Sequence, residues 1–273
     1  MAYVISSISM KGGVGKTTSV VCLGRGLADR GKKILLVDLD AQGSLSIAMG
    51  CDYPERQLFT MAEILQKLKD TQTNPEVTEG ILFVSENLSY LPANRRMALA
   101  EQELVLTKGG EHVLERFLAC LTESGREYDY ILLDCPPSLG MMTVNALAVS
   151  DGVLIPTQAE YLAVKGMEQV LQLVLQVQRK WNSKLKILGI LPTMVNPYTK
   201  DSKNVLQLLD EAYGEDVGIL SMIPYSVRAK EISSRRKSIY QLDKGGKVAS
   251  GYLQLVSEIL ALTTFVETGG ITR

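Results

Sequence analysis

The stretch that most constrains this chain is a glycine-rich loop near its N-terminus. Residues 9–18 read Ser-Met-Lys-Gly-Gly-Val-Gly-Lys-Thr-Thr, between the apolar run 4–8 and the apolar-periodic stretch 20–27. The run predicts a buried strand and the periodic stretch predicts a helix. Glycines let several backbone N–H groups converge on one anion, which the positive end of the helix dipole also attracts. The loop therefore predicts a phosphate-binding cradle.

The end of the loop makes this prediction more specific. Lys16 is placed to neutralise the β- and γ-phosphates, and the Thr17 hydroxyl is placed to reach Mg²⁺. The chain departs from the general pattern G-x-x-x-x-G-K-[ST] because Met10 replaces the first glycine and a second lysine, Lys11, precedes the double glycine. We expect nucleotide contacts from Lys11, Gly12, Gly13, Val14, Gly15, Lys16, Thr17 and Thr18.

Acidic residues end two other apolar runs. The run 34–37 leads into Asp38 and Asp40, and the run 130–133 leads into Asp134. Carboxylates at the ends of parallel strands lie on the ligand edge of a sheet, and alternation sends Asp38 and Asp40 to the same side. One can orient the waters of the metal and the other the attacking water, and Asp134 can reach Mg²⁺ through water. The alternative is that Asp38 or Asp40 only caps the next helix.

The remaining pattern alternates strands and helices. Strands are expected at 82–84, 88–91, 152–156, 185–191 and 219–224, and helices at 61–68, 111–122, 160–181 and 245–265. This order predicts one α/β domain over residues 1–273, with a doubly wound, mainly parallel sheet flanked by helices. The ligand is expected at the carboxyl ends of the strands.

Composition limits the classes of protein. A hydrophobic content of 46% with 22% charged residues is typical of a soluble globular protein. No apolar run reaches about 18 residues, and the early strand leaves no room for a signal peptide, so a cytoplasmic protein is expected. The four cysteines lack C-x-x-C spacing and are expected to be reduced core residues. With a net charge of −1, nucleic-acid binding would need a local basic patch.

Several motifs resemble those of one family in the same order. Lys-Gly-Gly-Val-Gly-Lys-Thr-Thr is similar to the deviant Walker A signature of the ParA/MinD family of P-loop ATPases. Residues 38–44 resemble its D-x-D-P-Q-G-N element, with Ala41 and Ser44 as departures. Further ParA-like segments are L-P-A-N at 91–94, D-C-P-P-S-L-G at 134–140, P-x-Q-x-E-Y at 156–161 and I-P-x-x-x-R at 223–228. The resemblance extends from Met1 to about Leu262.

The resemblance implies roles for individual residues. Lys11, Lys16 and Asp40 would be catalytic, with Asp40 positioning the hydrolytic water and Lys11 reaching the phosphates held by a second subunit. Asp38 would support a magnesium site with Thr17 and Asp134. The loop at Pro136 would sense the γ-phosphate, Asn196 would contact adenine, and Pro224 with Tyr225 would close over the base. Since the chain lacks an Asn-Lys-x-Asp motif that reads guanine, ATP is favoured over GTP.

The family's cycle implies a DNA-partitioning ATPase. ATP would join two subunits, the homodimer would bind non-specific duplex DNA such as the nucleoid, and a ParB-like partner would stimulate slow hydrolysis and release it. Candidate DNA contacts are Lys200, Lys203, Arg228, Lys230, Arg235 and Arg236. Tyr198 stands where many ParA proteins have an arginine. The absence of an N-terminal helix-turn-helix segment argues against sequence-specific binding.

Three alternatives remain at this stage. A membrane-cycling protein of the MinD type would need a basic amphipathic C-terminal helix, but residues 258–267 contain no lysine or arginine, so stable membrane association is not expected. An electron-transfer ATPase like the nitrogenase iron protein would need cluster-binding cysteines beyond Cys135. A ParA-like protein that positions a protein cargo on the nucleoid would have the same chemistry, so the sequence leaves this alternative open.

Overall fold

The computed structural model describes residues 2–69, 75–196, 198–235 and 238–267, with the backbone alone at 162–165, 230, 233–235 and 265–267. Its centre is one sheet of seven strands in the order β3-β4-β2-β5-β1-β6-β7. The strands are β1 (Tyr3–Ser7), β2 (Ile34–Asp38), β3 (Leu82–Ser85), β4 (Leu88–Leu91), β5 (Tyr130–Asp134), β6 (Gly152–Gln158) and β7 (Lys186–Thr193). All neighbouring pairs are parallel except β3 with β4. The predicted fold class is confirmed.

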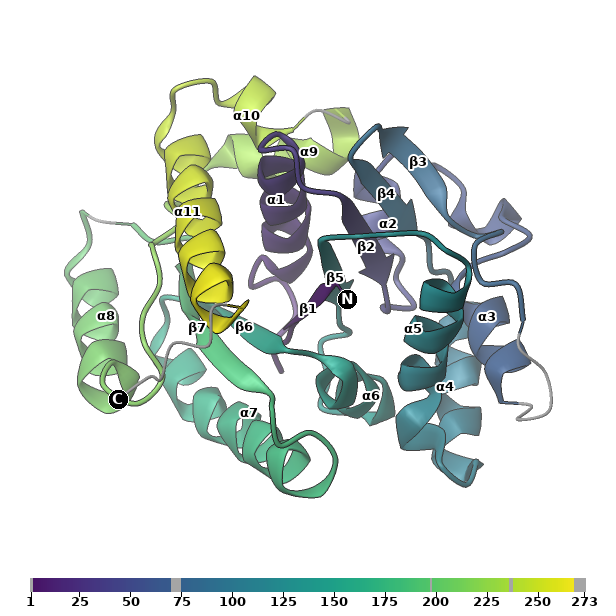
Figure 1. Ribbon diagram of the computed structural model, residues 1–273. Helices are drawn as coiled ribbons and strands as arrows, with labels where there is room; N and C mark the ends of the chain where they lie inside the picture. The colour runs from purple at the N-terminus through teal and green to yellow at the C-terminus, as the bar shows by residue number, and fades with distance from the viewer. Residues whose placement is uncertain (1, 70–74, 197, 236–237, 268–273) are drawn as a thin grey trace.

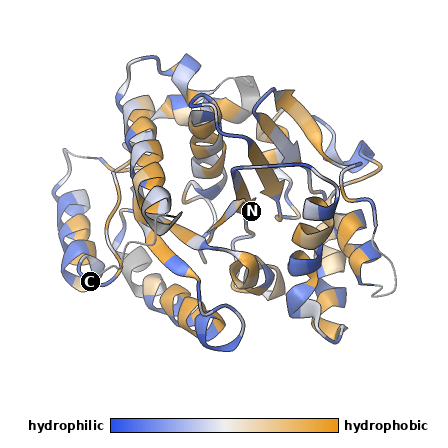
Figure 2. Ribbon diagram, viewed as in Figure 1, coloured by the Kyte–Doolittle hydropathy of each residue, from blue (hydrophilic) through white to orange (hydrophobic). Residues whose placement is uncertain are grey.

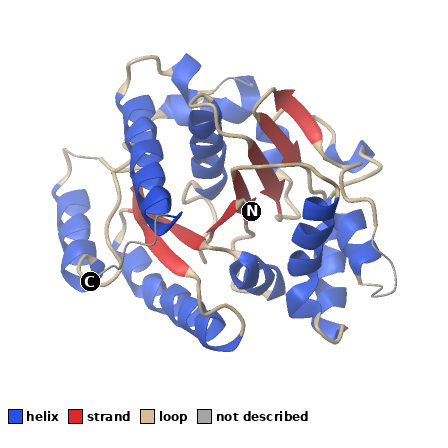
Figure 3. Cartoon of the chain, in the orientation of Figure 1, coloured by secondary structure: helices blue, strands red, loops and turns tan. Residues whose placement is uncertain are grey.

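Helices cover both faces of the sheet (Figures 1 and 3). One face carries α1 (Lys16–Ala28), α2 (Ser44–Ala48), α9 (Val227–Arg235), α10 (Ile239–Leu242) and α11 (Lys247–Glu267). The other carries α3 (Met61–Leu68), α4 (Arg96–Leu106), α5 (Val113–Glu123), α6 (Met141–Val149) and α7 (Tyr161–Lys180). Helix α8 (Lys200–Tyr213) packs against α7. The described part of the chain also contains two short 3₁₀ helices, η1 (Pro54–Arg56) and η2 (Gly110–His112).

The sheet separates two hydrophobic cores, because alternate residues of a strand point to opposite faces. In β1, Ile5 belongs to the core under α1 and α11, whereas its neighbour Val4 belongs to the core under α5, α6 and α7. The central strands are correspondingly apolar along most of their length (Figure 2). Cys22, Cys51, Cys120 and Cys135 are free and buried, as predicted.

The strand predicted at 219–224 is wrong as a regular element. This segment makes only isolated bridges, Ile190 with Ile219 and Val195 with Pro224. The amide of Leu220 donates to the Ile190 carbonyl, and the amide of Ile223 donates to the Pro192 carbonyl. Pro192 has no N–H to donate between these two bonds, so the ladder is interrupted there.

Candidate nucleotide-binding site

The glycine-rich loop lies between β1 and α1 at the carboxyl edge of the sheet. Gly13 and Gly15 have φ angles of 76° and 89°, in the left-handed region that favours glycine. Gly15 is the N-cap of α1, so the loop leads directly into the positive end of the helix dipole. The Thr193 hydroxyl, at the end of β7, donates to the Val14 carbonyl at 2.7 Å. The loop is therefore held to the end of β7 on one side and continues directly into α1 on the other.

Lys16 occupies the first position of α1 and is buried, with 7% of its surface exposed. Burial lowers the pKa of its ammonium group, whereas the nearby carboxylates of Asp134 and Asp40 favour the charged form. The two carboxylates keep the buried ammonium group charged, and it lies at the start of the helix next to the loop amides that can hold an anion. This arrangement fits a phosphate ligand.

Asp38 and Asp134 are direct neighbours across the β2–β5 ladder. Burial and the charge of Asp38 raise the pKa of the Asp134 carboxyl group. Burial also raises the pKa of Asp38, although its carboxylate accepts hydrogen bonds from the Ser46 amide at 2.8 Å and the Ser46 hydroxyl at 2.7 Å. A cation bound next to these two buried carboxylates would stabilise their charged forms and reduce the repulsion between them.

The residues at this point fit a magnesium ion. The Thr17 hydroxyl lies 2.7 Å from Asp134 Oδ2, to which it donates. Asp134 Oδ1 is buried and has no hydrogen-bond partner among the described residues. Hydroxyl and carboxylate oxygens are the ligands that Mg²⁺ prefers, directly or through its waters. A divalent ion would satisfy the orphaned oxygen and reduce the repulsion between the two acids.

Asp40 follows β2 and is half-buried. Its Oδ1 accepts a hydrogen bond from the Gln42 amide at 2.9 Å, and its own amide donates to Asp38 Oδ1 at 3.1 Å. The carboxylate of Asp40 is therefore held by the turn that follows the strand, within electrostatic range of Lys16. This position suits a residue that orients a water at the phosphate.

Lys11 differs from Lys16 because its side chain is exposed. Its Nζ lies 2.6 Å from Glu160 Oε2, with 50% and 43% of the two side chains exposed. Glu160 is the N-cap of α7, directly after β6. The second lysine of the loop therefore points to an acid of its own chain in this structure.

The other predicted nucleotide contacts lie on loops that follow β5 and β7. Pro136 is buried just after β5. The next residue, Pro137, lies close to the glycine-rich loop, because a Cβ placed on Gly12 would be 4.0 Å from the Cβ of Pro137. Asn196 follows β7 and is exposed, and Pro224 and Tyr225 lie beside it because the Tyr225 amide donates to the Val195 carbonyl. These residues are thus at the edge where they were predicted.

The described basic residues of the two predicted DNA clusters lie on two different helices, α8 and α9. Lys200 and Lys203 are exposed on the first turn of α8. Arg228 pairs with Asp243 at 3.1 Å, and Asp243 Oδ2 accepts the Val248 amide of α11. Lys230 and Arg235 belong to α9, and Arg236 lies outside the described residues. Lys247, which the sequence did not single out, contacts the hydroxyl of Tyr198, close in sequence to the first cluster, at 3.3 Å.

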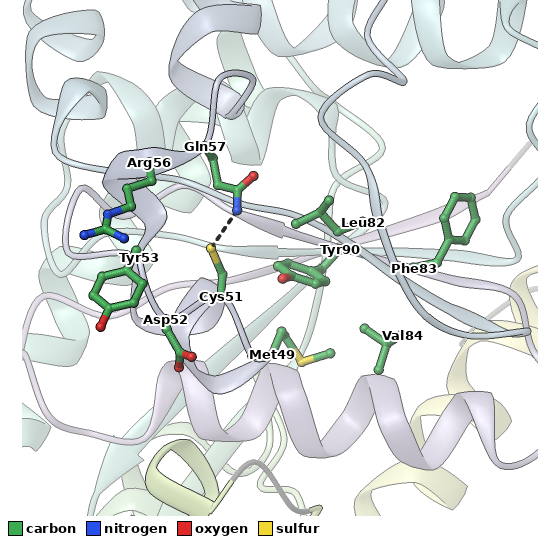
Figure 4. Close-up of a pocket in the computed structure, with 11 residues that line it drawn as sticks. Met49, Cys51, Asp52, Tyr53, Arg56, Gln57, Leu82, Phe83, Val84 and Tyr90 are labelled. Atoms are coloured by element: carbon green, nitrogen blue, oxygen red, sulfur yellow. Dashed lines mark hydrogen bonds between the residues drawn. The ribbon is translucent and has the colours of Figure 1, made fainter.

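A cavity of about 600 Å³ lies away from this edge, between η1 and the edge strand β3 (Figure 4). Tyr90, Leu82 and Met49 line it, and Gln57 donates to the Cys51 sulfur at 3.5 Å. None of its lining residues is a predicted site residue. The cavity is therefore separate from the candidate nucleotide site.

Four polar residues near the edge were not predicted as parts of the site. Glu160 forms an ion pair with Lys11, and the Ser46 hydroxyl donates a hydrogen bond to Asp38. The Thr193 hydroxyl donates to the Val14 carbonyl of the loop, and Glu101 accepts a hydrogen bond from the Met142 amide at 3.0 Å. Glu160, Thr193 and Glu101 act on residues far from them along the chain, so periodicity and local motifs contain no signal for these contacts. Ser46 lies only eight residues after Asp38, and a signal for it could have been sought next to the 38–44 segment.

Comparison with known proteins identifies the family. Residues 2–187 match the family described as AAA domain. The chain is 38% identical over 267 residues to the sporulation initiation inhibitor protein Soj of Bacillus subtilis, covering 96% of this chain and 99% of Soj. It is 31% identical to the chromosome partitioning protein ParA of Caulobacter vibrioides, covering 94% of each.

A solved structure agrees in fold over nearly the whole chain. Cobyrinic acid a,c-diamide synthase from Mycobacterium smegmatis, with a bound ATP analogue and magnesium, has a TM-score of 0.81 and 31% identity. The match covers 98% of this chain and 97% of that one. The P-loop geometry, the sheet and these relatives agree, and the chain belongs to the Soj and ParA family of partitioning ATPases.

Proposed function

We propose that this chain is a DNA-partitioning ATPase in which ATP and Mg²⁺ control dimerisation and DNA binding. The observation that carries this proposal is the position of Lys16. It is buried at the N-terminus of α1, against Asp134 and Asp40, on a loop with left-handed glycines. That constellation favours a triphosphate with a divalent cation, and one of the relatives named above is a chromosome partitioning protein.

Each site residue has a role that follows from its position. The loop amides and Lys16 would hold the phosphates, while Asn196, Pro224 and Tyr225 would border the base. Thr17, Asp38 and Asp134 would hold Mg²⁺, which supplies charge neutralisation when bound. Asp40 would orient the attacking water, because the Gln42 amide fixes its carboxylate.

Dimerisation requires Lys11 to change partners. In the single chain Lys11 is paired with Glu160, so it must leave this acid to reach phosphates held by a second subunit. The pair is more than one-third exposed on both sides and is worth only about 0.2–1 kcal/mol. Phosphates carry more charge than one carboxylate, which favours the exchange when ATP is bound.

The basic clusters support DNA binding without sequence preference. Lys200 and Lys203 on α8 and Arg228 on α9 are exposed, and Lys247 contacts Tyr198 close in sequence to the first cluster. Contacts to DNA phosphates need only such exposed cations. Among the described residues no helix is long and apolar enough to cross a membrane. The exposed cations and the partitioning relative support association with the nucleoid and a ParB-like partner that stimulates weak basal hydrolysis.

Two substitutions test the proposal. Lys16→Ala removes the buried cation and should weaken ATP binding on the order of 100-fold. Asp40→Ala removes the residue that orients the water and should lower turnover by about 100-fold while ATP binding is kept. Nucleotide binding is measured by equilibrium dialysis, dimerisation by sedimentation velocity, and DNA retention on an unrelated duplex at several salt concentrations.

The Asp40 variant should form a long-lived dimer on DNA in the presence of ATP and Mg²⁺. Two results would contradict the proposal. One is hydrolysis by the Asp40 variant at the wild-type rate. The other is a wild-type protein that stays monomeric with ATP and Mg²⁺ and does not retain duplex DNA.

A further inference from the structure

Ser46 is a fully buried residue of α2 whose hydroxyl lies between two loops at the carboxyl edge of the sheet. Its Oγ donates to Asp38 Oδ2 at 2.7 Å and accepts a hydrogen bond from the Ala93 amide at 2.9 Å. The Ala93 carbonyl is 3.4 Å away, but the single hydroxyl proton serves the shorter bond to Asp38. Asp38 ends β2 and Ala93 follows β4, the neighbouring parallel strand, so the hydroxyl joins the loops that follow the two strands.

The carboxylate of Asp38 is held by the segment that follows it. Oδ2 accepts hydrogen bonds from both the amide and the hydroxyl of Ser46, and Oδ1 accepts one from the Asp40 amide at 3.1 Å. The Ser46 amide belongs to the first turn of α2, where amides have no partner within the helix, so Asp38 also caps this helix. Three donors therefore fix the orientation of a carboxylate that stands beside Asp134 on the next strand.

The L-P-A-N motif at residues 91–94 gives Ser46 a fixed support. The Met61 amide, at the start of α3, donates to the Pro92 carbonyl at 2.8 Å. Ala93 is fully buried, and a Cβ on Gly43, in the turn before α2, would lie only 3.1 Å from its carbonyl oxygen. The motif is thus tied to α3 and in close contact with the turn that leads into α2, which fixes the position of the Ser46 hydroxyl.

We propose that Ser46, supported by the L-P-A-N motif, is a positioning residue for the magnesium site and for the turn that carries Asp40. Because Ser46 fixes Asp38 Oδ2, Oδ1 stays on the Asp40 amide, and one side chain orients both the acid beside Asp134 and the turn of the residue assigned to the attacking water. Ser46 acts through Asp38 and needs no contact of its own with nucleotide or metal. The inference rests on the proposed function, to which the ion and the water belong.

Loss of the hydroxyl alone would loosen this arrangement. In Ser46→Ala, Asp38 Oδ2 keeps only the amide donor, and the buried Ala93 amide loses its acceptor. A carboxylate that is no longer held can rotate, and loss of a group that orients a metal ligand typically costs about 10–100-fold in metal affinity or activity. We therefore expect a higher Mg²⁺ requirement and slower turnover, with nucleotide binding in the absence of Mg²⁺ unchanged.

The test compares Ser46→Ala, Ser46→Thr and Ser46→Cys in the full chain. Mg²⁺ binding is measured without turnover, as the Mg²⁺ concentration that gives half of the Tm shift at saturating ADP. Ser46→Ala should raise this concentration about tenfold and lower ATP turnover about tenfold. Threonine keeps the hydroxyl and should restore the wild-type values. Cysteine is a weak donor that fills the same space, so its intermediate effect tests the hydrogen bond even if the alanine variant does not fold.

Thr263→Val is the matched control for the loss of a buried hydroxyl. Thr263 is buried on α11, contacts the Tyr130 hydroxyl at 2.6 Å and donates to the Ile259 carbonyl at 2.8 Å. Tyr130 begins β5 and Asp134 ends it, so this contact lies at the opposite edge of the sheet. Thr263→Val should lower the Tm, as Ser46→Ala does, but should leave the Mg²⁺ requirement unchanged.

Two results would overturn the inference. One is a wild-type Mg²⁺ requirement in both Ser46→Ala and Ser46→Cys, which would leave Ser46 with a structural role like that of Thr263. The other is an equal change in Ser46→Thr and Ser46→Ala. A wild-type protein whose Tm does not respond to Mg²⁺ at saturating ADP would instead reject the proposed function, and this role with it, so the two failures are seen in different proteins.

Discussion

Asp134 is the residue whose surroundings best fit a bound cation. It is fully buried beside Asp38, its pKa is raised by burial and by that neighbour, and its Oδ1 has no partner among the described residues. Such a buried carboxyl group destabilises the folded chain when no ion is bound, because it has lost its hydration and no cation compensates that loss. A residue in this state is expected at a functional site rather than in a structural ion pair.

Asp134→Asn should therefore separate stability from function. The amide removes the repulsion with Asp38 and should raise the free energy of unfolding by about 1 kcal/mol, or the Tm by about 2–4 °C. Mg²⁺-dependent turnover should fall at least tenfold, because an amide attracts the ion and its waters less strongly. Thermal unfolding without nucleotide and turnover against Mg²⁺ concentration measure the two effects.

The control for this variant is Asp216→Asn, at an exposed acid, which should change stability by less than about 0.5 kcal/mol. A lower Tm for Asp134→Asn would contradict the interpretation, since it would mean that the carboxylate stabilises the chain without an ion.

At the scale of elements, the contact between α1 and the C-terminal helices depends on a glycine. A Cβ on Gly26 would lie 2.6 Å from both the Tyr240 hydroxyl oxygen and Val256 Cγ2. Tyr240 also donates to the Cys22 carbonyl at 2.7 Å, so it is held in place. The helix that starts at the phosphate loop is therefore fixed against the C-terminal part of the chain.

Gly26→Ala should destabilise the chain by about 1–2 kcal/mol, because the cost of overpacking exceeds the gain in helix propensity. Gly166→Ala is the matched control, since Gly166 lies inside α7 and nothing approaches its Cβ position within 4 Å. That substitution should stabilise by about 0.5–1 kcal/mol. Urea unfolding measures both, and stabilisation by Gly26→Ala would contradict the predicted close contact.

Element boundaries were predictable where local chemistry defines them. The helix expected at 61–68 is observed as Met61–Leu68, and a capping box formed by Thr60 and Glu63 begins it. The segment 219–224 has the apolar composition of a strand, but whether it forms a ladder depends on Pro192 in another strand. Composition of a segment does not contain information about its neighbour in the sheet.

At the scale of the whole molecule, the pair between Lys11 and Glu160 links the phosphate loop to the start of α7. If Lys11 must leave Glu160 to enter a dimer, removing the acid should favour assembly. Each of the two subunits gives up one such pair, so Glu160→Gln should strengthen ATP-dependent dimerisation by up to about fivefold per subunit, the value of one exposed ion pair. Sedimentation velocity with a non-hydrolysed ATP analogue and Mg²⁺ measures the dimerisation constant.

Glu168→Gln, at an exposed acid farther along α7, should leave the constant unchanged. A weaker dimer for Glu160→Gln would mean that the acid also takes part in the assembled interface, which would contradict a role confined to the single chain.

The loop, the acidic strand ends and the α/β class could be predicted from consecutive residues. Glycine conformation, the helix dipole and the periods of strands and helices are local properties, so a linear pattern is enough to infer them. The contacts that complete the site are of another kind. Lys11 meets Glu160 across 149 residues, and Asp134 meets Thr17 across 117. Only the packing of the sheet and its helices brings such residues together, since sequence distance says nothing about their distance in space.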